Sequence, residues 1–560
     1  MSAAISARLA GLDVIVAEKH NLIGGTTARS GGMIWAPCNP LAIADGVDDS
    51  LEMARLYIQH ETGNFFDSVR VDTYLRTAPE MIETYRQKTS AMRFVRNDLA
   101  ADNHPNLPGA KQRGRTVTVP PFDARQLGKR MRQLAPPIKE LTFLGMQIQP
   151  GRELNHFFRA VSSWASFAFV VGKLMSHSYD MLFYGRTLRL ANGNALAARL
   201  FKSASDMNIR FLMSSPASEL VTVDGQVKGA ILESPSGRTC VLARRGVVLA
   251  CGGFPHDPVR RRTLAPVGAL GAGTYALGPT TNVGDGLTMG EAAGGMVEDK
   301  LPNAVSWTPV SRIAKGDGRY ALFPHSFDRN KPGFIAVTHH GRRFISEGAI
   351  GNDLVRAMVR ECDDRSPEAF LITDHHTLRR YGMGLVRPWP LPLGHHLRSG
   401  YLIRGRDVGE LAARTGIDSA ALMQTIANFN ANALKGQDPD FHRGQSELER
   451  RNGDNTVKPN PCLAPIAQPP FYAIRIYPGD FSTLAGLRTD EGARVLDNQN
   501  RPIERLFAVG SDSCSLFAGT SPAGGSTLGP ALTFGYIAGK RLSQLADQDV
   551  TQDTSTRKAS

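Results

Sequence analysis

The chain has 560 residues, a formal net charge of +13 and six cysteines. Its length exceeds what one compact core supports and predicts two or more domains. The cysteines stand far apart with no C-x-x-C pair, which argues against a disulfide scaffold or a zinc or iron–sulfur site and is typical of reduced thiols in the cytoplasm. The basic residues are scattered, so no nucleic-acid groove is expected; the positive field either attracts an anionic cofactor or membrane surface or serves solubility.

The N-terminal residues have the pattern of the second half of a βαβ unit. Small and apolar residues at 2–9 predict a short helix, residues 13–17 predict a buried parallel strand, and Glu18 stands at the end of that strand. The first half of such a unit, a hydrophobic strand that runs into G-x-G-x-x-G, would have to lie before Met1.

The next part of the chain alternates between helical and extended patterns. The periodicity predicts helices over residues 50–90, 124–180 and 194–207. Short strands with turn residues at Asp224-Gly225 and at 235–237 follow, and the last of these strands, 246–250, runs into Gly252 and Gly253. A second glycine-rich stretch, 277–295, starts a helix at Asp285.

The C-terminal half contains an insertion and a return. From about residue 297 to 460 the composition shifts toward His, Arg and Pro, which suggests an inserted domain. A strand at 506–509, a glycine-rich loop and a helix from Pro530 onward then form another strand–loop–helix element of the phosphate-binding type.

Four segments predict a bound dinucleotide. A carboxylate at Glu18 can accept both hydroxyls of a ribose, and the stretch IGGTTARSGG at 23–32 brings backbone amides and hydroxyls close to a pyrophosphate, although a tight surface turn is the alternative reading of that stretch. The hairpin near Ala217, the segment VVLACGGF and the segment LFAVGSD, with Asp512 near the ribityl chain, indicate FAD and not NAD. The predicted cofactor contacts are Glu18, Lys19, Gly24, Gly25, Thr26, Thr27, Ser30, Gly31, Gly32, Ala217, Ala250, Gly252, Gly253, Asp285, Gly510, Asp512, Thr527 and Leu528.

Seven motifs together resemble a known flavoprotein superfamily. AEKHNLIGGTTARSGGMIW, GNALAARLFKSA, VVLACGGF, NVGDGL, GRRFISE, YPGDFSTLAGL and GTSPAGGSTLGPALTFGYIAG are similar to the FAD-dependent fumarate reductases and 3-ketosteroid dehydrogenases, and are closer to the ketosteroid Δ1-dehydrogenase branch. The resemblance implies an α/β protein with a Rossmann-like FAD-binding domain over residues 1–275 and 465–545. It also implies an inserted α+β substrate-capping domain over 276–464 and a disordered tail over 546–560.

The resemblance also bears on the first residues. Members of the superfamily begin with a strand and G-x-G-x-x-G directly before the equivalent of Ser2. We therefore expect either a start codon assigned too late or a real truncation. A chain that truly begins at Met1 would leave a strand-shaped gap in its sheet and bind FAD poorly.

The catalytic pattern of the branch is only partly present. Its members remove two hydrogens beside a ketone, with three tyrosines and a glycine N–H at the site. Gly525 retains the glycine, whereas Ser521, Gly351 and Asn103 stand where the resemblance implies the tyrosines. The arginine acid of fumarate reductases would also fall at Gly351, and H-T-M-G-G is missing at 482–487.

Replacement groups for the tyrosines are open at this point. Tyr320, His325, Tyr381 and Tyr477 are either functional groups or structural side chains, and Asp328 with Arg329 is either a buried ion pair or a pair of substrate contacts. The predicted catalytic set is Ser521, Gly525, Tyr320 and Tyr381. No metal is predicted, because adjacent histidines such as His339 and His340 point to opposite faces of a strand.

The predicted function is FAD-dependent dehydrogenation of a CH–CH bond beside a ketone, on a steroid-like apolar substrate, with an electron acceptor that the sequence does not name. The alternatives are a flavin-dependent reductase of a small enone or unsaturated acid, and a degenerate flavin-binding member with little turnover. The apolar stretch at 164–175 is too short to span a bilayer. It is either a buried or substrate-lining helix or a peripheral membrane patch.

Overall fold

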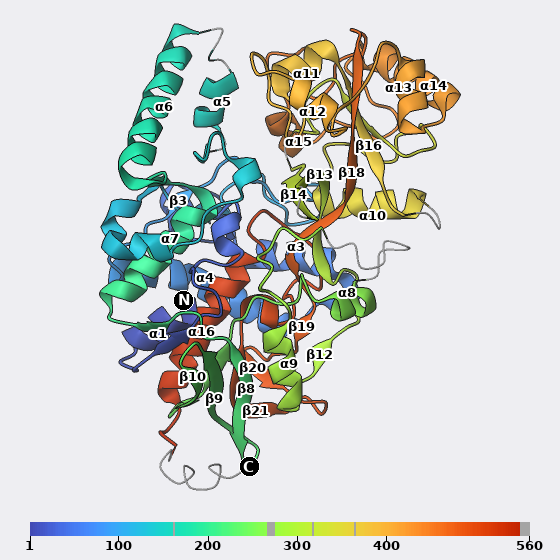
Figure 1. Cartoon of the computed structure of the whole chain (residues 1–560). Coiled ribbons are helices and arrows are strands. Elements are labelled where there is room, and N and C mark those ends of the chain that lie inside the picture. Colours follow the sequence, from blue (N-terminus) through green and yellow to red (C-terminus); the bar gives the residue numbers. More distant parts are fainter. Residues whose placement is uncertain are drawn as a thin grey trace.

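The computed structural model describes residues 1–149, 151–158, 160, 163–265, 275–315, 318–326, 328–362 and 366–548. Most of the predicted C-terminal tail therefore lies outside the described residues. Figure 1 shows the N-terminal and C-terminal elements together in the lower part of the molecule, an upper lobe built from the middle of the chain, and helix α6 standing to one side of that lobe.

Helix α1 (Ser2–Leu9) and helix α16 (Leu528–Gln544) join the two ends of the described chain (Figure 1). Their backbones approach closely because α16 carries glycine at the contact: a Cβ on Gly539 would lie 2.6 Å from the backbone N of Ala7. Ser6 Oγ donates to the carbonyl of Tyr536 at 2.7 Å and secures the register. The predicted convergence of the N-terminal and C-terminal segments is thus built into a helix pair.

The predicted βαβ half and hairpin are both present. β1 (Ile15–Ala17) pairs in parallel with β7 (Arg210–Leu212). The antiparallel sheet has β8 (Ala217–Val223), β9 (Gln226–Ser234) and β10 (Gly237–Leu242), with turns at the predicted glycines. A third sheet has β11 (Val247–Leu249) parallel to β21 (Pro502–Ala508), which pairs with β20 (Arg494–Leu496).

The two parallel strand pairs of this domain are separate. Among the described residues β1 pairs only with β7, and β11 pairs only with β21. Residues of both pairs, among them Ile15, Val16, Val247 and Val248, line the large cavity described below.

The helical stretches that the periodicity predicts are shorter and more broken in the structure. The stretch at 50–90 is α3 (Leu51–Thr62), a 3-10 turn η2 (Gly63–Phe65) and α4 (Ser68–Lys88). The stretch at 124–180 is η3 (Ala124–Gln133), η4 (Lys139–Leu141), α5 (Arg152–Phe158) and α6 (Trp164–Tyr184). Gly63 and Gly128 both have positive φ and explain the interruptions, since other residues avoid that backbone conformation.

The remaining elements of the lower part connect these units. They are η1 (Thr27–Arg29), β2 (Ile34–Trp35), α2 (Pro40–Ala44), β3 (Val95–Arg96), β4 (Thr116–Thr118), β5 (Phe122–Asp123), β6 (Arg189–Leu190), α7 (Asn192–Asp206), α8 (Pro258–Leu264), α9 (Asp285–Ala292), β12 (Val297–Glu298), β19 (Gly486–Leu487) and η6 (Gly510–Asp512).

The upper lobe, which we call the cap, is a mixed domain around one sheet. Its strands are β13 (Val305–Lys315), β14 (Arg319–Pro324), β15 (Phe334–Val337), β16 (Ala369–Asp374), β17 (Ile403–Gly405) and β18 (Phe471–Thr483). Its helices are α10 (Gly351–Glu361), α11 (His375–Tyr381), α12 (Gly394–Arg398), α13 (Val408–Thr415), α14 (Ser419–Ala433) and α15 (Glu447–Asn452). Because β18 pairs with β13, β16 and β17, the chain stays in the cap sheet beyond the predicted limit at residue 464.

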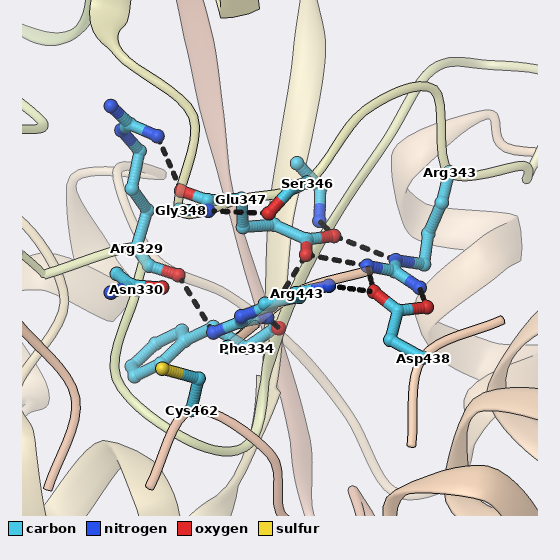
Figure 2. A network of polar contacts seen from close by, with 12 residues as sticks. Arg329, Asn330, Phe334, Arg343, Ser346, Glu347, Gly348, Asp438, Arg443 and Cys462 are labelled. Carbon is cyan, nitrogen blue, oxygen red and sulfur yellow. Dashed lines mark hydrogen bonds and ion pairs between the residues drawn. The ribbon is translucent and has the colours of Figure 1, made fainter. Parts of the chain in front are cut away.

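A buried ionic network fixes the loops of the cap (Figure 2). The Glu347 carboxylate is fully buried and lies 2.8 Å from Arg343 Nη2 and 2.9 Å from Arg443 Nη1. Arg343 also pairs with Asp438 at 2.8 Å, and Arg329 donates to the Glu347 carbonyl. These contacts hold residues 343–348 against the sheet and position the start of α10.

Candidate cofactor and substrate site

One cavity of about 2960 Å³ runs between the two ends of the chain and along the cap. It exceeds the roughly 300–1,000 Å³ of an ordinary ligand pocket because it joins the cofactor region, the seam with the cap and the space between β1 and β11. The glycine-rich segments at 23–32 and 521–528 both line it. The convergence that the sequence predicts is therefore present in the structure.

The predicted cofactor contacts gather around this cavity. The residues among them that line it are Glu18, Lys19, Gly24, Gly25, Thr26, Thr27, Ser30, Gly31, Gly32, Ala217, Ala250, Gly252, Asp285, Gly510, Thr527 and Leu528. Gly253 and Asp512 do not line it.

The first glycine loop is backed by the start of α7. Gly193 N donates to the Ser30 carbonyl at 3.0 Å, and Ser30 Oγ donates to the Thr27 carbonyl at 2.8 Å. Gly32 has φ +67°, and a Cβ there would lie 2.5 Å from the carbonyl carbon of Asn192. Only glycine fits this close approach, and the opposite side of the loop is left open to the cavity.

Charged groups frame the part of the cavity next to β1. The Glu18 carboxylate accepts a hydrogen bond from His20 N at 2.9 Å, and burial raises its pKa. Lys19 Nζ lies 2.7 Å from Asp285 Oδ2 at the start of α9, and Asn282 Nδ2 donates to the Gly252 carbonyl at 3.1 Å. These contacts tie the loop after β11 and the start of α9 to the end of β1.

Asp512 supports the loops and does not face the cavity. Its carboxylate is fully buried and accepts hydrogen bonds from the backbone amides of Cys251 and Gly253, the latter at 3.0 Å. Burial raises the pKa of Asp512, and these amides act in the opposite sense. Its position differs from the predicted contact with a ribityl chain, because the carboxylate is taken up in joining the end of β11 to the end of β21.

The residues that line the cavity fit FAD. The N-terminus of α16 presents the backbone at Thr527 and Leu528 to the cavity, and Gly510 adds a residue with φ +67°. Free amides at a helix N-terminus and along glycine loops attract the phosphates of a dinucleotide, and a carboxylate such as Glu18 matches a ribose diol.

The residues aligned with the catalytic pattern also meet at the cavity. Asn103, Gly351, Ser521 and Gly525 all line it. Asn103 Nδ2 donates to the Ser521 carbonyl at 2.7 Å, and the Tyr57 hydroxyl donates to the Pro522 carbonyl at 2.7 Å. Gly525 has φ +101°, and its carbonyl accepts from Trp35 N at 3.2 Å. This loop is therefore fixed by side chains from outside the terminal segment.

Gly351 opens helix α10 against the cap sheet. A Cβ at this position would lie 3.0 Å from the Trp307 carbonyl oxygen and 3.1 Å from the Thr308 Cα. The backbone thus comes too close to β13 for a larger side chain without movement. The packing of α10 against β13 therefore leaves no room for a tyrosine side chain at this position.

The two tyrosines of the predicted catalytic set have different surroundings. Tyr320 is 45% exposed and does not line the cavity. Its ring packs against the Arg312 guanidinium, whose carbon is 4.5 Å from the ring centroid. The predicted catalytic role of Tyr320 is therefore not supported. Tyr477 contacts the same guanidinium. Tyr381 does line the cavity, but its hydroxyl donates to Asp454 Oδ2 at 2.7 Å, and burial together with Asp454 raises its pKa. Tyr381 therefore stays protonated.

Sequence reasoning missed a histidine that joins the cap to the lower part of the molecule. His104 Nε2 lies 3.0 Å from Asp353 Oδ2 of α10, and its Nδ1 contacts Glu61 of α3. Burial opposes the positive charge, but hydrogen bonds to Asp353 and Glu61 outweigh it and raise the pKa of His104 to about 10. The only sequence signal was its position next to Asn103.

Helix α6 lies at the edge of the cavity and has two apolar faces. Phe167, Val170 and Leu174 line the cavity, in line with a substrate-lining helix. Other apolar side chains of α6 are open to solvent: Trp164 is 85% and Leu182 79% exposed, and Met175, Tyr179 and Phe183 are also exposed. Within the part of the chain that the structure describes, no helix is both long and apolar enough to cross a bilayer.

Comparisons with known proteins identify the family of the chain. The family model for the FAD binding domain matches residues 1–528. The chain is 38% identical to the 4-oxocyclohex-2-ene-1-carboxylate 5-dehydrogenase of Sinomonas cyclohexanicum, over 98% of this chain and 92% of that protein. It is 33% identical to the 3-oxosteroid 1-dehydrogenase of Mycolicibacterium smegmatis, over 96% of this chain and 94% of that protein.

A solved structure shares the whole fold. The 3-ketosteroid Δ1-dehydrogenase of Sterolibacterium denitrificans, in complex with 1,4-androstadiene-3,17-dione, superposes with a TM-score of 0.88 at 31% identity and covers 97% of each chain. FAD is accordingly the cofactor of this protein. The chain belongs to the FAD binding domain family, in the superfamily of fumarate reductases and 3-ketosteroid dehydrogenases and on its ketosteroid dehydrogenase side.

Proposed function

We propose that this FAD-dependent dehydrogenase forms a carbon–carbon double bond next to the ketone of a ring. The observation that carries the proposal is the convergence of Ser521, Gly525 and Asn103 on the cavity that the glycine loops of the cofactor region also line. Bound FAD supplies the hydride acceptor for such a reaction. The protein must polarise the ketone, remove a proton from the α-carbon and exclude water.

The terminal loop provides the donors for the ketone. Ser521 and Gly525 lie on the same loop and line the same cavity, and the hydroxyl of the one and the backbone N–H of the other are the donors that we assign to the ketone. Fixed donors aimed at an oxygen that gains negative charge stabilise the transition state and acidify the neighbouring carbon. The hydrogen bonds from Asn103 and Tyr57 to this loop keep the donors in place during the reaction.

A cyclic ketone is the substrate class that best fits the cavity and the relatives. The named relatives act on 3-oxosteroids and on an oxocyclohexene carboxylate, which share a ring ketone. Ile138, Phe143 and Phe167 give the cavity an apolar wall on the side of the lower domain. A steroid-like ketone uses this wall along its whole length.

A small ring ketone with a carboxylate is the second candidate. It is favoured by the 38% identity to the oxocyclohexene carboxylate dehydrogenase and by Arg329 and Arg387, which are among the arginines that line the cavity. Arg387 Nη2 donates to the carbonyls of Glu140 and Thr142 at 2.8 and 3.0 Å and so lies at the seam between the cap and the lower domain. Burial lowers the pKa of Arg329 to about 10, which leaves it a cation at neutral pH.

The experiment compares these substrates on one enzyme preparation. Purified protein that retains flavin is incubated with a dye acceptor and either a 3-oxosteroid or a 4-oxocyclohexanecarboxylate, and the products are identified by mass spectrometry. Loss of two mass units with either ketone supports the proposal and selects the substrate class. A flavin-containing protein that turns over neither ketone, or only reduces enones and unsaturated acids with a reduced dye, would overturn it in favour of the reductase or the flavin-binding alternative.

Two further proposals concern the place of the enzyme in the cell. The exposed face of α6 supports contact with a lipid surface, because aromatic and aliphatic side chains on one helix face insert at the interface of a bilayer. Flotation with anionic lipid vesicles should carry the protein, and Trp164→Ser with Leu182→Ser should abolish flotation while dye reduction continues. The wide spacing of the cysteines, with no C-x-x-C pair, supports a location in the cytoplasm.

A further inference from the structure

A chain of hydrogen bonds runs through the cap from the wall of the cavity into its interior. Asp328 Oδ2 lies 2.7 Å from His325 Nδ1, and His325 Nε2 lies 2.8 Å from Ser311 Oγ. Ser311 Oγ in turn lies 2.6 Å from the Tyr401 hydroxyl. His325 and Ser311 are fully buried, and each has hydrogen-bond partners within the chain, as buried polar groups usually do.

Asp328 is the member of this chain that reaches the cavity. It lines the cavity, whereas His325, Ser311 and Tyr401 do not. Its Oδ2 also accepts from Gly384 N at 3.0 Å, but its Oδ1 is buried and has no hydrogen-bond partner among the described residues. One carboxylate oxygen thus accepts from two donors, and the other accepts from none. A buried oxygen without a hydrogen bond costs free energy, which a ligand or a functional role can explain.

The loop that carries Asp328 is attached to the same wall as Gly351. His325 N donates to the Pro309 carbonyl at 2.9 Å, one residue beyond Thr308, which the backbone of Gly351 contacts. Arg329 donates to the carbonyl of Glu347, which lies a few residues before Gly351. Figure 2 shows Arg329 beside Glu347 at the end of this network. The loop of Asp328 and the start of α10 at Gly351, where the resemblance implies a tyrosine that this chain lacks, are therefore held against the same strand, β13.

The Asp–His–Ser order does not make the group a hydrolytic triad. A nucleophilic serine has to reach the substrate, but Ser311 is fully buried and does not line the cavity. Its hydroxyl is bonded to Tyr401, and Gly384 packs over both side chains, so that a Cβ there would lie 3.3 Å from Ser311 Oγ. Asp328 is the end of the chain that lines the cavity.

We propose that Asp328 is the base that removes the α-proton of the ketone and that His325 positions it. This inference rests on the proposed function. The proton passes from the α-carbon to the Asp328 carboxylate, and the electron pair of that C–H bond becomes the second bond between the α- and β-carbons. Bound FAD would supply the acceptor for the hydride that leaves the β-carbon. The ketone is the hydrogen donor, and the oxidised cofactor is the acceptor.

The charges around Asp328 suit this role. Burial by itself raises the pKa of Asp328, but its partner His325, the Gly384 amide and the Arg329 cation outweigh burial and lower this pKa. The group is then a carboxylate at neutral pH. A carboxylate of low pKa can remove a proton from a ketone once donors such as Ser521 and Gly525 polarise the carbonyl.

The test measures proton removal separately from turnover. The holoenzyme is mixed with the ketone in D₂O without an electron acceptor, and deuterium uptake at the α-carbon is followed by mass spectrometry. Asp328→Asn should lower both this exchange and kcat by about 10²–10⁴-fold while flavin content and substrate binding stay unchanged. Asp328→Ala should regain exchange when formate is added, because the small acid can occupy the space of the lost carboxylate.

A matched variant separates this role from a structural one. Asp438→Asn removes another buried, ion-paired carboxylate of the cap that does not line the cavity. It should lower thermal stability but keep α-carbon exchange and show no response to formate. His325→Gln should lower kcat more than it changes KM, since it leaves Asp328 in place but less well oriented.

The results distinguish this inference from the proposed function. If the native enzyme shows neither exchange nor turnover with any ring ketone, the proposed function itself fails. If the native enzyme exchanges and turns over but Asp328→Asn does so at the same rate, or if formate has no effect on a folded, flavin-containing Asp328→Ala, then Asp328 is not the base.

Discussion

His104 Nε2 lies 3.0 Å from Asp353 Oδ2, and this contact joins the FAD-binding domain to the cap. Both residues lie close in sequence to the wall of the cavity. His104 follows Asn103, and Asp353 stands two positions after Gly351. Asn103 and Gly351 both line the cavity. An ion pair at this seam sets how closely the two walls approach. Closure of such domains around a substrate is a common way to exclude water from hydride transfer.

The His104 contact predicts a specific pH dependence of stability. The pKa of His104 is raised from 6.5 to about 10, so the charged form contributes stability that is complete below about pH 6.5 and is lost as the pH rises through about 10. His104→Gln should therefore lower the melting temperature most in the lower part of this range, and the difference from the native enzyme should shrink toward its upper end. Thermal melts of both proteins across this range give the result; a constant difference would contradict the contact.

Ser521→Ala should slow catalysis with little effect on folding. Ser521 lines the cavity, and its backbone carbonyl already accepts from Asn103 Nδ2 at 2.7 Å, so the loop keeps its position without the hydroxyl. Loss of one donor to a developing oxyanion lowers kcat by about 10²-fold. Steady-state kinetics with the ketone and a dye acceptor check this, with Thr520→Ala as the control, since Thr520 precedes Ser521 and does not line the cavity. Equal kcat values for the two variants would exclude Ser521 as a carbonyl donor.

Gly32→Ala should weaken FAD binding. The residue has φ +67°, and the new Cβ would lie 2.5 Å from the carbonyl carbon of Asn192, so the loop has to move away from α7. The displaced loop no longer presents its amides to the cavity. Gly46→Ala also has positive φ but meets nothing within 4 Å and serves as control. Flavin content after dialysis should fall for the first variant alone.

Glu347→Gln should destabilise the cap. The carboxylate is fully buried between Arg343 and Arg443, and these two cations lower its pKa in spite of burial (Figure 2). Removal of one partner of a buried ion pair costs about 3–5 kcal/mol because the remaining charges stay desolvated. The stability from Glu347 is complete above its ordinary pKa of 4.5 and is lost as the pH falls through the lowered value. Limited proteolysis and thermal melts should show the cap opening first; an unchanged melting temperature would contradict the network.

Much of the fold follows from local patterns in the sequence. The helix at residues 2–9, the parallel strand that ends before Glu18, the hairpin turns at Gly225 and Gly237 and the strand at 247–249 are all present, because each depends on short-range periodicity or on a glycine at a turn. The cofactor loops were predictable for the same reason. A glycine-rich loop between a strand and a helix has few other uses.

The catalytic residues were harder to predict because their roles depend on long-range contacts. Tyr320 has the chemistry of a catalytic group, but it packs on Arg312 outside the cavity. Asp512 looks like a cofactor ligand by its place after a strand, yet its carboxylate is used by the amides of Cys251 and Gly253. His104 carries no local motif, and only the packing of the cap against the lower domain reveals it. Asp328 was a candidate substrate contact from the sequence, but its partners His325 and Gly384 are visible only in the structure.

The most direct test of the account is an anaerobic mixing experiment with the purified holoenzyme. A ring ketone is added in the absence of any acceptor, and the visible absorbance of the flavin is followed with time. The account predicts that the absorbance bleaches with the ketone and stays unchanged with the corresponding saturated ring that lacks the carbonyl. A protein that purifies without flavin, or a bound flavin that no ring ketone bleaches, would contradict it.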